Sequence, residues 1–529
     1  MSVASYDVVV VGYGAAGTAA AIEAADAGAR VLVLDRGYGG GASALSGGIV
    51  YAGGGTRYQR AAGLDDTPDN MFAYLRQETG GVVSDETLRR FCASSPAMID
   101  WLEANGARYR ATLCPYKTSY PTDAHYLYYS GNEKAWPYAS QAVPAARGHR
   151  QVAKGMSSGK AFMAALHESA MRKGVAFKPL SRVFALIVED GAVVGVRYRT
   201  ADPDELAIVR SRRVGEFAGK LANWSPPLGT RLGARAESAW QAHAVETAAR
   251  APSVILAAGG FVFNPEMKAE WAGGFADITP LGTLGDDGTA IRLGVTAGGA
   301  TAHMDHMTAW RFLSPPSAFL EGVTVGPRGD RIANEDLYGA THSQIMIEKH
   351  EGRGFLILDS RAWQKARGQV RTQTQLFQAA LALYLFTAGH KKAPTLEALA
   401  FKIGVPAASL VETVVSYNTG ILDGDGDPAH KATELCVPLA APPFYAIDIS
   451  IKNTRAFPAP GLTLGGLRVD EQTGQVLGPA GDVVAGLYAA GRTAVGICSN
   501  SYVSGLSLAD CIFSGRRAGQ HAATHPSRM

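Results

Sequence analysis

The chain has 529 residues, which is enough to bury a large core and to form at least two domains. Apolar residues make up 47% of it and charged residues 18%, the usual proportions of a globular protein, and a formal net charge of +3 gives no reason to expect a nucleic-acid partner. Its five cysteines have neither a metal-binding spacing nor a CxxC pair, which favours a reducing compartment, and we expect the cytoplasm.

The N-terminal stretch "DVVVVGYGAAGTAAAIEAADAGARVLVLDRG" indicates a strand, a glycine turn, a helix and a second strand. Its first apolar run is too short to span a bilayer, so it predicts a buried strand, and we expect no integral membrane segment. Gly12, Gly14 and Gly17 form GxGxxG, and Asp35 ends the second strand. In this context the pattern is typical of a dinucleotide site: the first glycine permits a tight turn, the second admits a pyrophosphate, the third lets helix and strand pack, and the acid binds a ribose.

A second loop of glycine and serine, "RGYGGGASALSGGIVYAGGG", follows the acid directly. NAD binding does not require such a loop, whereas FAD is longer and lies extended through its domain, so we predict FAD. Two later stretches, "VILAAGGFVFN" and "GLYAAGRTAVG", repeat an apolar strand that runs into small residues, and each can bring backbone against the cofactor. The expected cofactor contacts are Gly12, Gly14, Ala15, Ala16, Gly17, Asp35, Arg36, Ala42, Ser43, Ser46, Gly47, Gly48, Ala258, Gly259, Gly491, Arg492, Ser507 and Leu508.

Three features stand out in the middle of the chain. Residues 116–138 hold seven aromatic side chains, which predict either a packed cluster under a loop or an aromatic wall for a flat apolar ligand. Residues 185–200 predict a hairpin around Asp190-Gly191. An insert at about 201–250 is expected to be irregular, with a helix after its Pro-Pro break, and to be a surface elaboration, an edge cover, an assembly element or a lid.

Several motifs in order, "GYGAAG", "GGGASALSGG", "ILAAGGF", "GDDGTAIRLGVTAGGA", "RIANEDLYG" and "SLADCIFSGRRAG", resemble the flavoprotein family of fumarate reductases, succinate dehydrogenases and 3-ketosteroid dehydrogenases. The resemblance implies an α/β fold: a Rossmann-type FAD-binding domain at 1–295 and 456–529, interrupted by an α+β catalytic domain at 296–455 that caps the substrate. Membrane-bound members attach flavin to a histidine of the early glycine-serine loop. Serine and alanine stand there in this chain, so non-covalent FAD is expected.

The C-terminal motif departs from that of the fumarate reductases. Their histidine and arginine, which bind substrate carboxylates, correspond to Cys498 and Tyr502 here, and no arginine follows "NEDLYGATHS" until Arg353. Without these cations a dicarboxylate substrate is not expected. The remaining hydroxyls beside a flavin suit a ketone, because a hydroxyl that donates to the carbonyl oxygen stabilises the enolate formed when the α-carbon loses a proton.

The hydroxyl pattern resembles the 3-ketosteroid Δ4-(5α)-dehydrogenases, which have a Tyr-x-Ser pair near the C-terminus and a catalytic-domain tyrosine. The resemblance implies that Ser504 abstracts the C4 proton, Tyr338 assists and relays it, and Tyr502 holds the C3 oxygen of a 3-keto-5α-steroid. Tyr338 alone is the alternative base. Where Δ1-dehydrogenases carry a proline-bearing segment, this chain has "GLSLADCIFSG", which favours Δ4.

Two other functions stay open at this point: a Δ1-dehydrogenase or another flavin enzyme acting on a neutral unsaturated carbonyl, and a flavin-binding electron-transfer or chaperone-like subunit. The sequence does not identify the electron acceptor.

Overall fold

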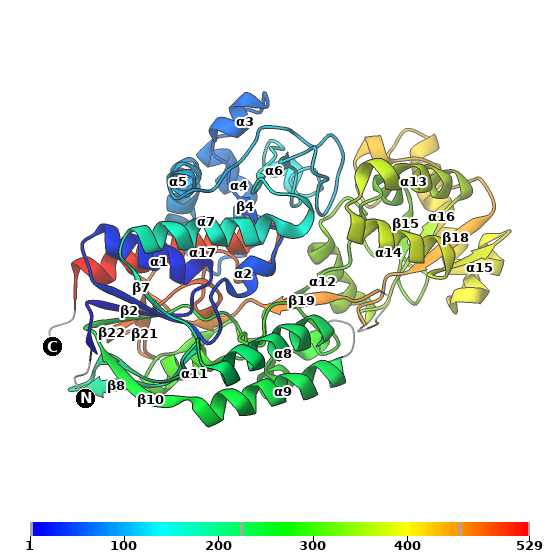
Figure 1. Ribbon diagram of the computed structural model, residues 1–529. Coiled ribbons are helices and arrows are strands. Elements are labelled where there is room, and N and C mark those ends of the chain that lie inside the picture. Colours follow the sequence, from blue (N-terminus) through cyan, green and yellow to red (C-terminus); the bar gives the residue numbers. More distant parts are fainter. Residues whose placement is uncertain (1–3, 223–225, 453, 455–456, 527–529) are drawn as a thin grey trace.

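The computed structural model describes residues 4–222, 226–452, 454 and 457–526 (Figure 1). The expected domain boundary at 456 and residues 223–225 of the insert lie outside the described residues. A six-stranded sheet forms the centre of the larger part of the molecule, with five parallel strands and one antiparallel edge strand. In spatial order its strands are β21 (Gln475–Leu477), β22 (Val483–Ala489), β11 (Ser253–Leu256), β2 (Val8–Val11), β3 (Val31–Leu34) and β7 (Ala176–Lys178).

The middle strands of this sheet are buried on both faces, which explains why β2 and β3 are continuous apolar runs instead of alternating patterns. Helix α1 (Ala15–Asp26) follows β2 and packs against the C-terminal helix α17 (Leu506–Thr524). The approach depends on glycine, since a Cβ at Gly515 would lie 2.3 Å from the carbonyl oxygen of Ala16. The two ends of the chain therefore close over one face of the sheet.

The hairpin expected at 185–200 is confirmed. Strands β8 (Ser181–Glu189) and β9 (Ala192–Thr200) pair antiparallel, and both Asp190 and Gly191 have positive φ, as a tight two-residue turn between twisted strands requires. With β10 (Val245–Arg250) and β1 (Ala4–Ser5) they form a four-stranded sheet.

The insert after this hairpin is helical, so the expectation of an irregular segment is wrong. Helix α8 (Leu206–Ala222) packs against α9 (Pro226–His243), and α9 is the helix expected after the Pro-Pro break. The Trp240 indole fixes α9 to the hairpin by donating to the Leu180 carbonyl oxygen at 3.0 Å. Ile208 of α8 and Trp240 of α9 belong to one buried apolar cluster, against which Leu180, just before the hairpin, also packs.

A separate lobe at the right of Figure 1 contains a four-stranded antiparallel sheet with helices on both faces. Its strands are β15 (Val323–Val325), β16 (Phe355–Leu358), β18 (Phe444–Asp448) and β17 (His390–Ala393), and its helices are α12 (Gly339–His350), α13 (Ser360–Gln373), α14 (Leu376–Thr387), α15 (Leu396–Ile403) and α16 (Ala407–Leu422). The chain enters this lobe after β14 (Met307–Ala309) and returns through β19 (Pro460–Thr463), which pairs antiparallel with β14. The two connections therefore lie side by side.

Candidate active site

A cavity of 1280 Å³ opens at the carboxyl ends of the parallel strands, where open α/β sheets bind their ligands. Most of the expected cofactor contacts line it: Gly12, Gly14, Ala15, Ala16, Asp35, Arg36, Ala42, Ser43, Ser46, Ala258, Gly259, Gly491, Arg492, Ser507 and Leu508. Gly17, Gly47 and Gly48 lie outside the lining. A Cβ at Gly17 would meet the Gly12 carbonyl oxygen at 1.9 Å, whereas Gly47 and Gly48 pack against the Tyr120 ring and the Ser158 backbone.

Backbone geometry shapes the turn at the start of α1. Gly12 has φ +103°, and a Cβ there would lie 2.5 Å from the Ala257 carbonyl oxygen at the end of the neighbouring strand. Gly14, by contrast, has only one side-chain atom within 4 Å of where its Cβ would be, the Ser43 Oγ at 3.6 Å. The helix N-terminus thus presents bare backbone to the cavity, which is the arrangement that accepts a phosphate.

Asp35 lies at the cavity with its carboxylate already oriented. Its two oxygens accept hydrogen bonds from the backbone amides of Tyr13 at 2.8 Å and Gly37 at 2.7 Å. A carboxylate oxygen can accept a second donor, so the side chain retains capacity for a hydroxyl of the ligand.

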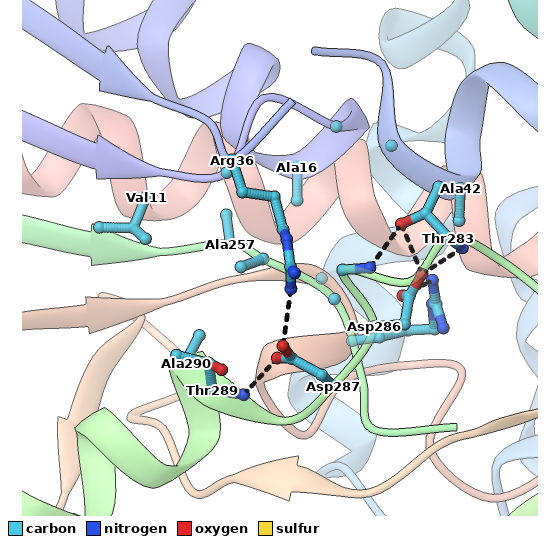
Figure 2. Close-up of a pocket in the computed structure, with 18 of the residues that line it drawn as sticks. Val11, Ala16, Arg36, Ala42, Ala257, Thr283, Asp286, Asp287, Thr289 and Ala290 are labelled. Atoms are coloured by element: carbon cyan, nitrogen blue, oxygen red, sulfur yellow. Dashed lines mark hydrogen bonds and ion pairs between the residues drawn. The ribbon is translucent and has the colours of Figure 1, made fainter. Parts of the chain in front are cut away.

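Two acidic residues that the sequence analysis did not single out complete the cavity (Figure 2). Asp287 forms an ion pair with Arg36 at 2.6 Å, and Asp286 pairs with Arg492 at 2.7 Å. The Nη1 atom of Arg492 is buried and has no hydrogen-bond partner. Both acids lie in "GDDG", a quoted family motif that could have identified them. A groove with bare backbone, carboxylates for hydroxyl groups and an unpaired guanidinium nitrogen fits the phosphates and ribityl chain of FAD.

The C-terminal hydroxyl residues lie beside this cavity, just before α17. Tyr502 lines it together with Trp310, and their ring centroids are 4.7 Å apart. Tyr338 caps the N-terminus of α12, with its ring centroid 6.5 Å from that of Tyr502. Ser504 is nearly buried, and its Oγ lies 2.9 Å from the phenol oxygen of Tyr128. The structure therefore brings the three predicted residues together and adds a fourth hydroxyl.

Tyr128 belongs to the aromatic stretch at 116–138, for which two interpretations were open. Tyr120 takes a packing role, because its phenol donates to the Gly47 carbonyl oxygen at 3.2 Å under the glycine loop. Tyr128 instead reaches Ser504, the predicted base. Local sequence gave no reason to select one tyrosine from seven aromatic residues, since the pairing depends on residues 376 positions apart.

All the phenols of this cluster are strongly held in the neutral form. Burial raises the pKa of Tyr338 well above its usual value, the neighbouring Tyr502 and Tyr128 raise it further, and hydrogen bonding with Ser504 opposes the change. Burial also raises the pKa of Tyr128 and of Tyr502. The cluster thus consists of uncharged hydroxyl groups at neutral pH, as a site for a neutral carbonyl requires.

A buried amide and a buried carboxylate connect the loops that carry these hydroxyls. The Asn132 Oδ1 accepts from the backbone amide of Tyr338 at 2.6 Å, and its Nδ2 donates to Glu78 at 2.7 Å. Glu78 also accepts from the Ser501 hydroxyl at 2.7 Å, next to Tyr502 in sequence. Burial raises the pKa of Glu78. One carboxylate therefore ties the C-terminal loop to the N-terminus of α12, and neither residue was expected from sequence.

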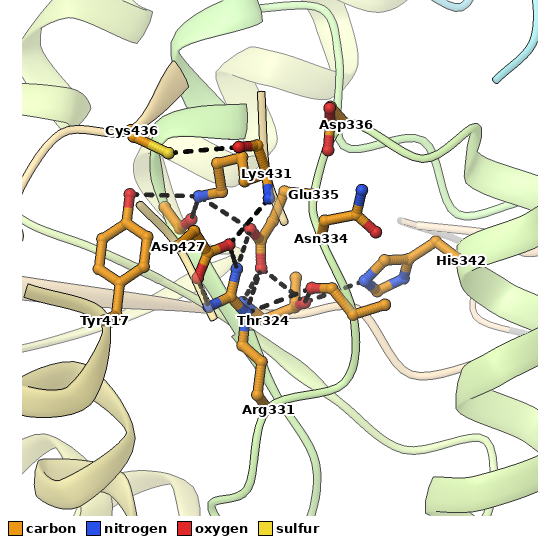
Figure 3. A network of polar contacts seen from close by, with 12 residues as sticks. Thr324, Arg331, Asn334, Glu335, Asp336, His342, Tyr417, Asp427, Lys431 and Cys436 are labelled. Atoms are coloured by element: carbon orange, nitrogen blue, oxygen red, sulfur yellow. Dashed lines mark hydrogen bonds and ion pairs between the residues drawn. The ribbon is translucent and has the colours of Figure 1, made fainter. Parts of the chain in front are cut away.

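A second buried network holds the segment that precedes Tyr338 (Figure 3). Glu335 pairs with Arg331 at 2.7 Å and with Lys431 at 2.8 Å, and it accepts from the backbone amide of Thr324 at 2.6 Å. These cations lower the pKa of Glu335 to about 2 against the cost of burial. The network explains Arg331 and Glu335 of "RIANEDLYG", because their ion pair anchors the loop that leads to Tyr338 within the lobe.

Comparison with known proteins agrees with this geometry. The model of the FAD binding domain family matches residues 7–507. A 3-oxo-5-alpha-steroid 4-dehydrogenase of Comamonas testosteroni is 38% identical over 501 residues, which cover 92% of each chain. The crystal structure of 3-ketosteroid-Δ4-(5α)-dehydrogenase from Rhodococcus jostii RHA1, in complex with 4-androstene-3,17-dione, superposes with a TM-score of 0.83 at 32% identity and covers 99% of this chain and 97% of that one.

A probable fumarate reductase of Shewanella frigidimarina is 27% identical over 531 residues, or 98% of this chain and 75% of the relative. These matches span nearly the whole chain, as the ordered motifs predicted. The chain belongs to the FAD-binding domain family, and FAD is its cofactor.

Proposed function

We propose that this protein is an FAD-dependent 3-ketosteroid dehydrogenase that introduces a C4–C5 double bond into 3-keto-5α-steroids. The observation that carries the proposal is the uncharged cluster of Ser504, Tyr128, Tyr338 and Tyr502 beside the FAD cavity. Two relatives support it: one at 38% identity is named for this activity, and a solved structure at 32% identity holds a 4-ene-3-keto steroid.

Each hydroxyl has a role that its position allows. Tyr502 faces the cavity and donates to the C3 carbonyl oxygen, which stabilises the enolate as the C4 proton leaves. Ser504 takes that proton as its own hydroxyl proton passes to a neighbouring phenol, and the phenol in turn releases a proton to solvent. FAD, when bound, supplies the acceptor for the hydride that leaves C5.

A serine base requires an immediate acceptor for the proton, because a serine hydroxyl is far less acidic than a phenol. Tyr128 lies 2.9 Å from the Ser504 oxygen and is the group best placed to pass the proton on. Tyr338 assists from the other lobe. This arrangement supports a serine base relayed by two phenols over a base formed by Tyr338 alone.

The proposal includes the architecture expected for the family: a Rossmann-type FAD-binding domain at 1–295 and 456–529, interrupted by a catalytic domain at 296–455. The parallel strand order and the separate lobe support this division. FAD binding is proposed to be non-covalent, since the residues described as lining the cavity include no histidine. Five free cysteines support a reducing compartment, and we propose the cytoplasm.

Anaerobic mixing of the holoenzyme with a saturated 3-keto-5α-steroid tests the proposal. The flavin absorbance is expected to bleach, and the product is expected to absorb as a 4-ene-3-one. A product with a C1–C2 double bond assigns the protein to the Δ1-dehydrogenases instead. Absence of flavin reduction favours an electron-transfer role.

A further inference from the structure

Helix α14 presents apolar side chains on the face that it exposes. Leu376 is 88% exposed, Leu383 is 64% exposed and Phe377 is 48% exposed, and Ala380 is exposed between them. Positions 376, 380 and 383 follow the helical repeat, so these residues form one stripe. We call Leu376, Phe377, Ala380 and Leu383 the α14 stripe.

The opposite face of α14 is buried in the core of the lobe. Gln378, Ala382 and Leu385 are buried there, and the Phe386 ring lies 4.8 Å from that of Trp363 on α13. Packing therefore explains only one side of the helix. Exposed apolar residues scattered singly are ordinary on protein surfaces, but an apolar stripe along a helix marks an interaction surface.

The segment that contains the stripe carries charge of one sign, and Asp123, which contacts its first turn, forms an ion pair with the buried Arg150. Residues 360–394, which include α13, α14 and β17, contain no aspartate or glutamate. Helix α13 and strand β17 both contact α14, one on each side of it in sequence. The basic residues of this segment are Arg361, Lys365, Arg367, Arg371, Lys391 and Lys392; the first two pair with Glu321, and the other four are exposed.

The stripe is connected to the catalytic hydroxyls through the first turn of α14. The Gln375 amide donates to Asp123 at 2.8 Å, and the Gln378 amide donates to the Tyr120 carbonyl oxygen at 3.2 Å. The acceptors, Tyr120 and Asp123, lie shortly before Tyr128 in the chain, and the Tyr128 phenol contacts the Ser504 hydroxyl. A membrane bound at α14 would therefore lie near residues 120–128, which end at the proposed active site.

We propose that the α14 stripe docks the protein on the surface of a bilayer that contains anionic lipids. Its apolar side chains would enter the headgroup boundary while the surrounding arginines and lysines bind anionic headgroups. A second copy of the chain suits this face less well, because a two-fold contact would bring the same basic segments together. Among the described residues, no helix is both long enough and apolar enough to cross a bilayer. The docking does not depend on the proposed function, but a steroid substrate, which partitions into bilayers, would give it a purpose.

Flotation of the holoenzyme with vesicles tests the docking without any turnover. Vesicles of phosphatidylcholine mixed with phosphatidylglycerol are expected to carry the protein at low salt, and pure phosphatidylcholine vesicles are not. The double substitution Leu376→Ser and Leu383→Ser is expected to weaken binding by about tenfold or more, because two exposed leucines lose their transfer into the interface. The matched control, Val415→Ser with Leu422→Ser on α16, removes two exposed apolar side chains outside the stripe and is expected to keep binding.

The flavin spectrum of each variant reports whether it is folded. Failure of the wild-type holoenzyme to bind the mixed vesicles at low salt overturns the proposal, as does equal loss of binding in both double variants. A concentration-dependent dimer that the Leu376 and Leu383 substitutions dissociate assigns the stripe to a second copy instead. Because the assay contains no steroid, none of these results bears on the proposed reaction.

Discussion

The FAD cavity and the hydroxyl cluster adjoin one another but are built from opposite kinds of groups. The cavity is lined with backbone and with ion pairs such as Arg36–Asp287 and Arg492–Asp286. The cluster around Ser504 is neutral, and burial keeps its phenols protonated. Charged groups therefore line the cavity for a charged cofactor, and neutral hydroxyls form the site that we propose for a reaction at a neutral ketone. Substitutions in the cluster should therefore slow turnover, whereas substitutions in the cavity should weaken FAD binding.

Substitution of Ser504, the proposed base, should have the largest effect on turnover. Ser504→Ala is expected to lower kcat for a 3-keto-5α-steroid by about 1,000-fold, the usual contribution of a general base, while FAD remains bound. Stopped-flow measurement of flavin reduction checks this, with Ser140→Ala on the exposed helix α6 (Tyr138–Gln141) as the control. A variant that retains the wild-type rate would remove Ser504 from the mechanism.

Substitution in the cavity should instead affect cofactor affinity. Asp286→Asn leaves the buried guanidinium of Arg492 without its carboxylate, which is expected to weaken FAD binding by about 100-fold. Titration of the apoprotein with FAD measures the change, and the exposed Asp277→Asn is the control. Equal affinity of the two variants would show that the ion pair does not shape the site.

Tyr128→Phe separates the two possible proton routes. Loss of one relay phenol is expected to slow flavin reduction by about 10- to 30-fold, less than loss of the base itself. Tyr126→Phe removes a nearby phenol that donates to the Ala153 carbonyl oxygen at 3.4 Å, and it is expected to leave the rate unchanged. Unchanged reduction in Tyr128→Phe would leave Tyr338 as the sole partner of Ser504.

The smallest expected effect is on stability in acid. Burial lowers the pKa of His342 from 6.5 to about 4, so between these values the unfolded chain binds a proton that the folded protein does not. Stability contributed by the neutral histidine is therefore complete above pH 6.5 and is lost as the pH falls, by about 2 kcal/mol at pH 5. Thermal unfolding of His342→Gln at pH 7 and pH 5 is expected to show a smaller difference than the wild type. An identical difference would contradict this account.

The sequence was most informative where local pattern and tertiary role coincide. The β2–α1–β3 unit, the hairpin at Asp190-Gly191, the family and the FAD cofactor were predicted correctly, because glycine spacing and strand periodicity directly encode backbone geometry. The catalytic trio stays a prediction, although the structure brings its members together.

What the sequence analysis missed depends on contacts between distant segments. The sequence analysis did not identify helix α8, which packs against α9. Tyr128 and Glu78 gain their positions only when residues more than 370 positions away fold onto them. No local pattern marks such a tyrosine or glutamate, so only the folded chain distinguishes them from ordinary core residues.

The pairing of α1 with α17 has a consequence for biosynthesis. The segment 483–524 contains strand β22, the hydroxyl pair Tyr502 and Ser504, and helix α17, which packs against α1. The glycine turn before α1 is synthesised much earlier. A nascent chain on the ribosome consequently lacks both a complete central sheet and the predicted base, Ser504, until this segment has been synthesised. Cofactor capture is therefore expected to follow the synthesis of this segment, and until then the exposed edge of β11 is a surface that chaperones would need to protect.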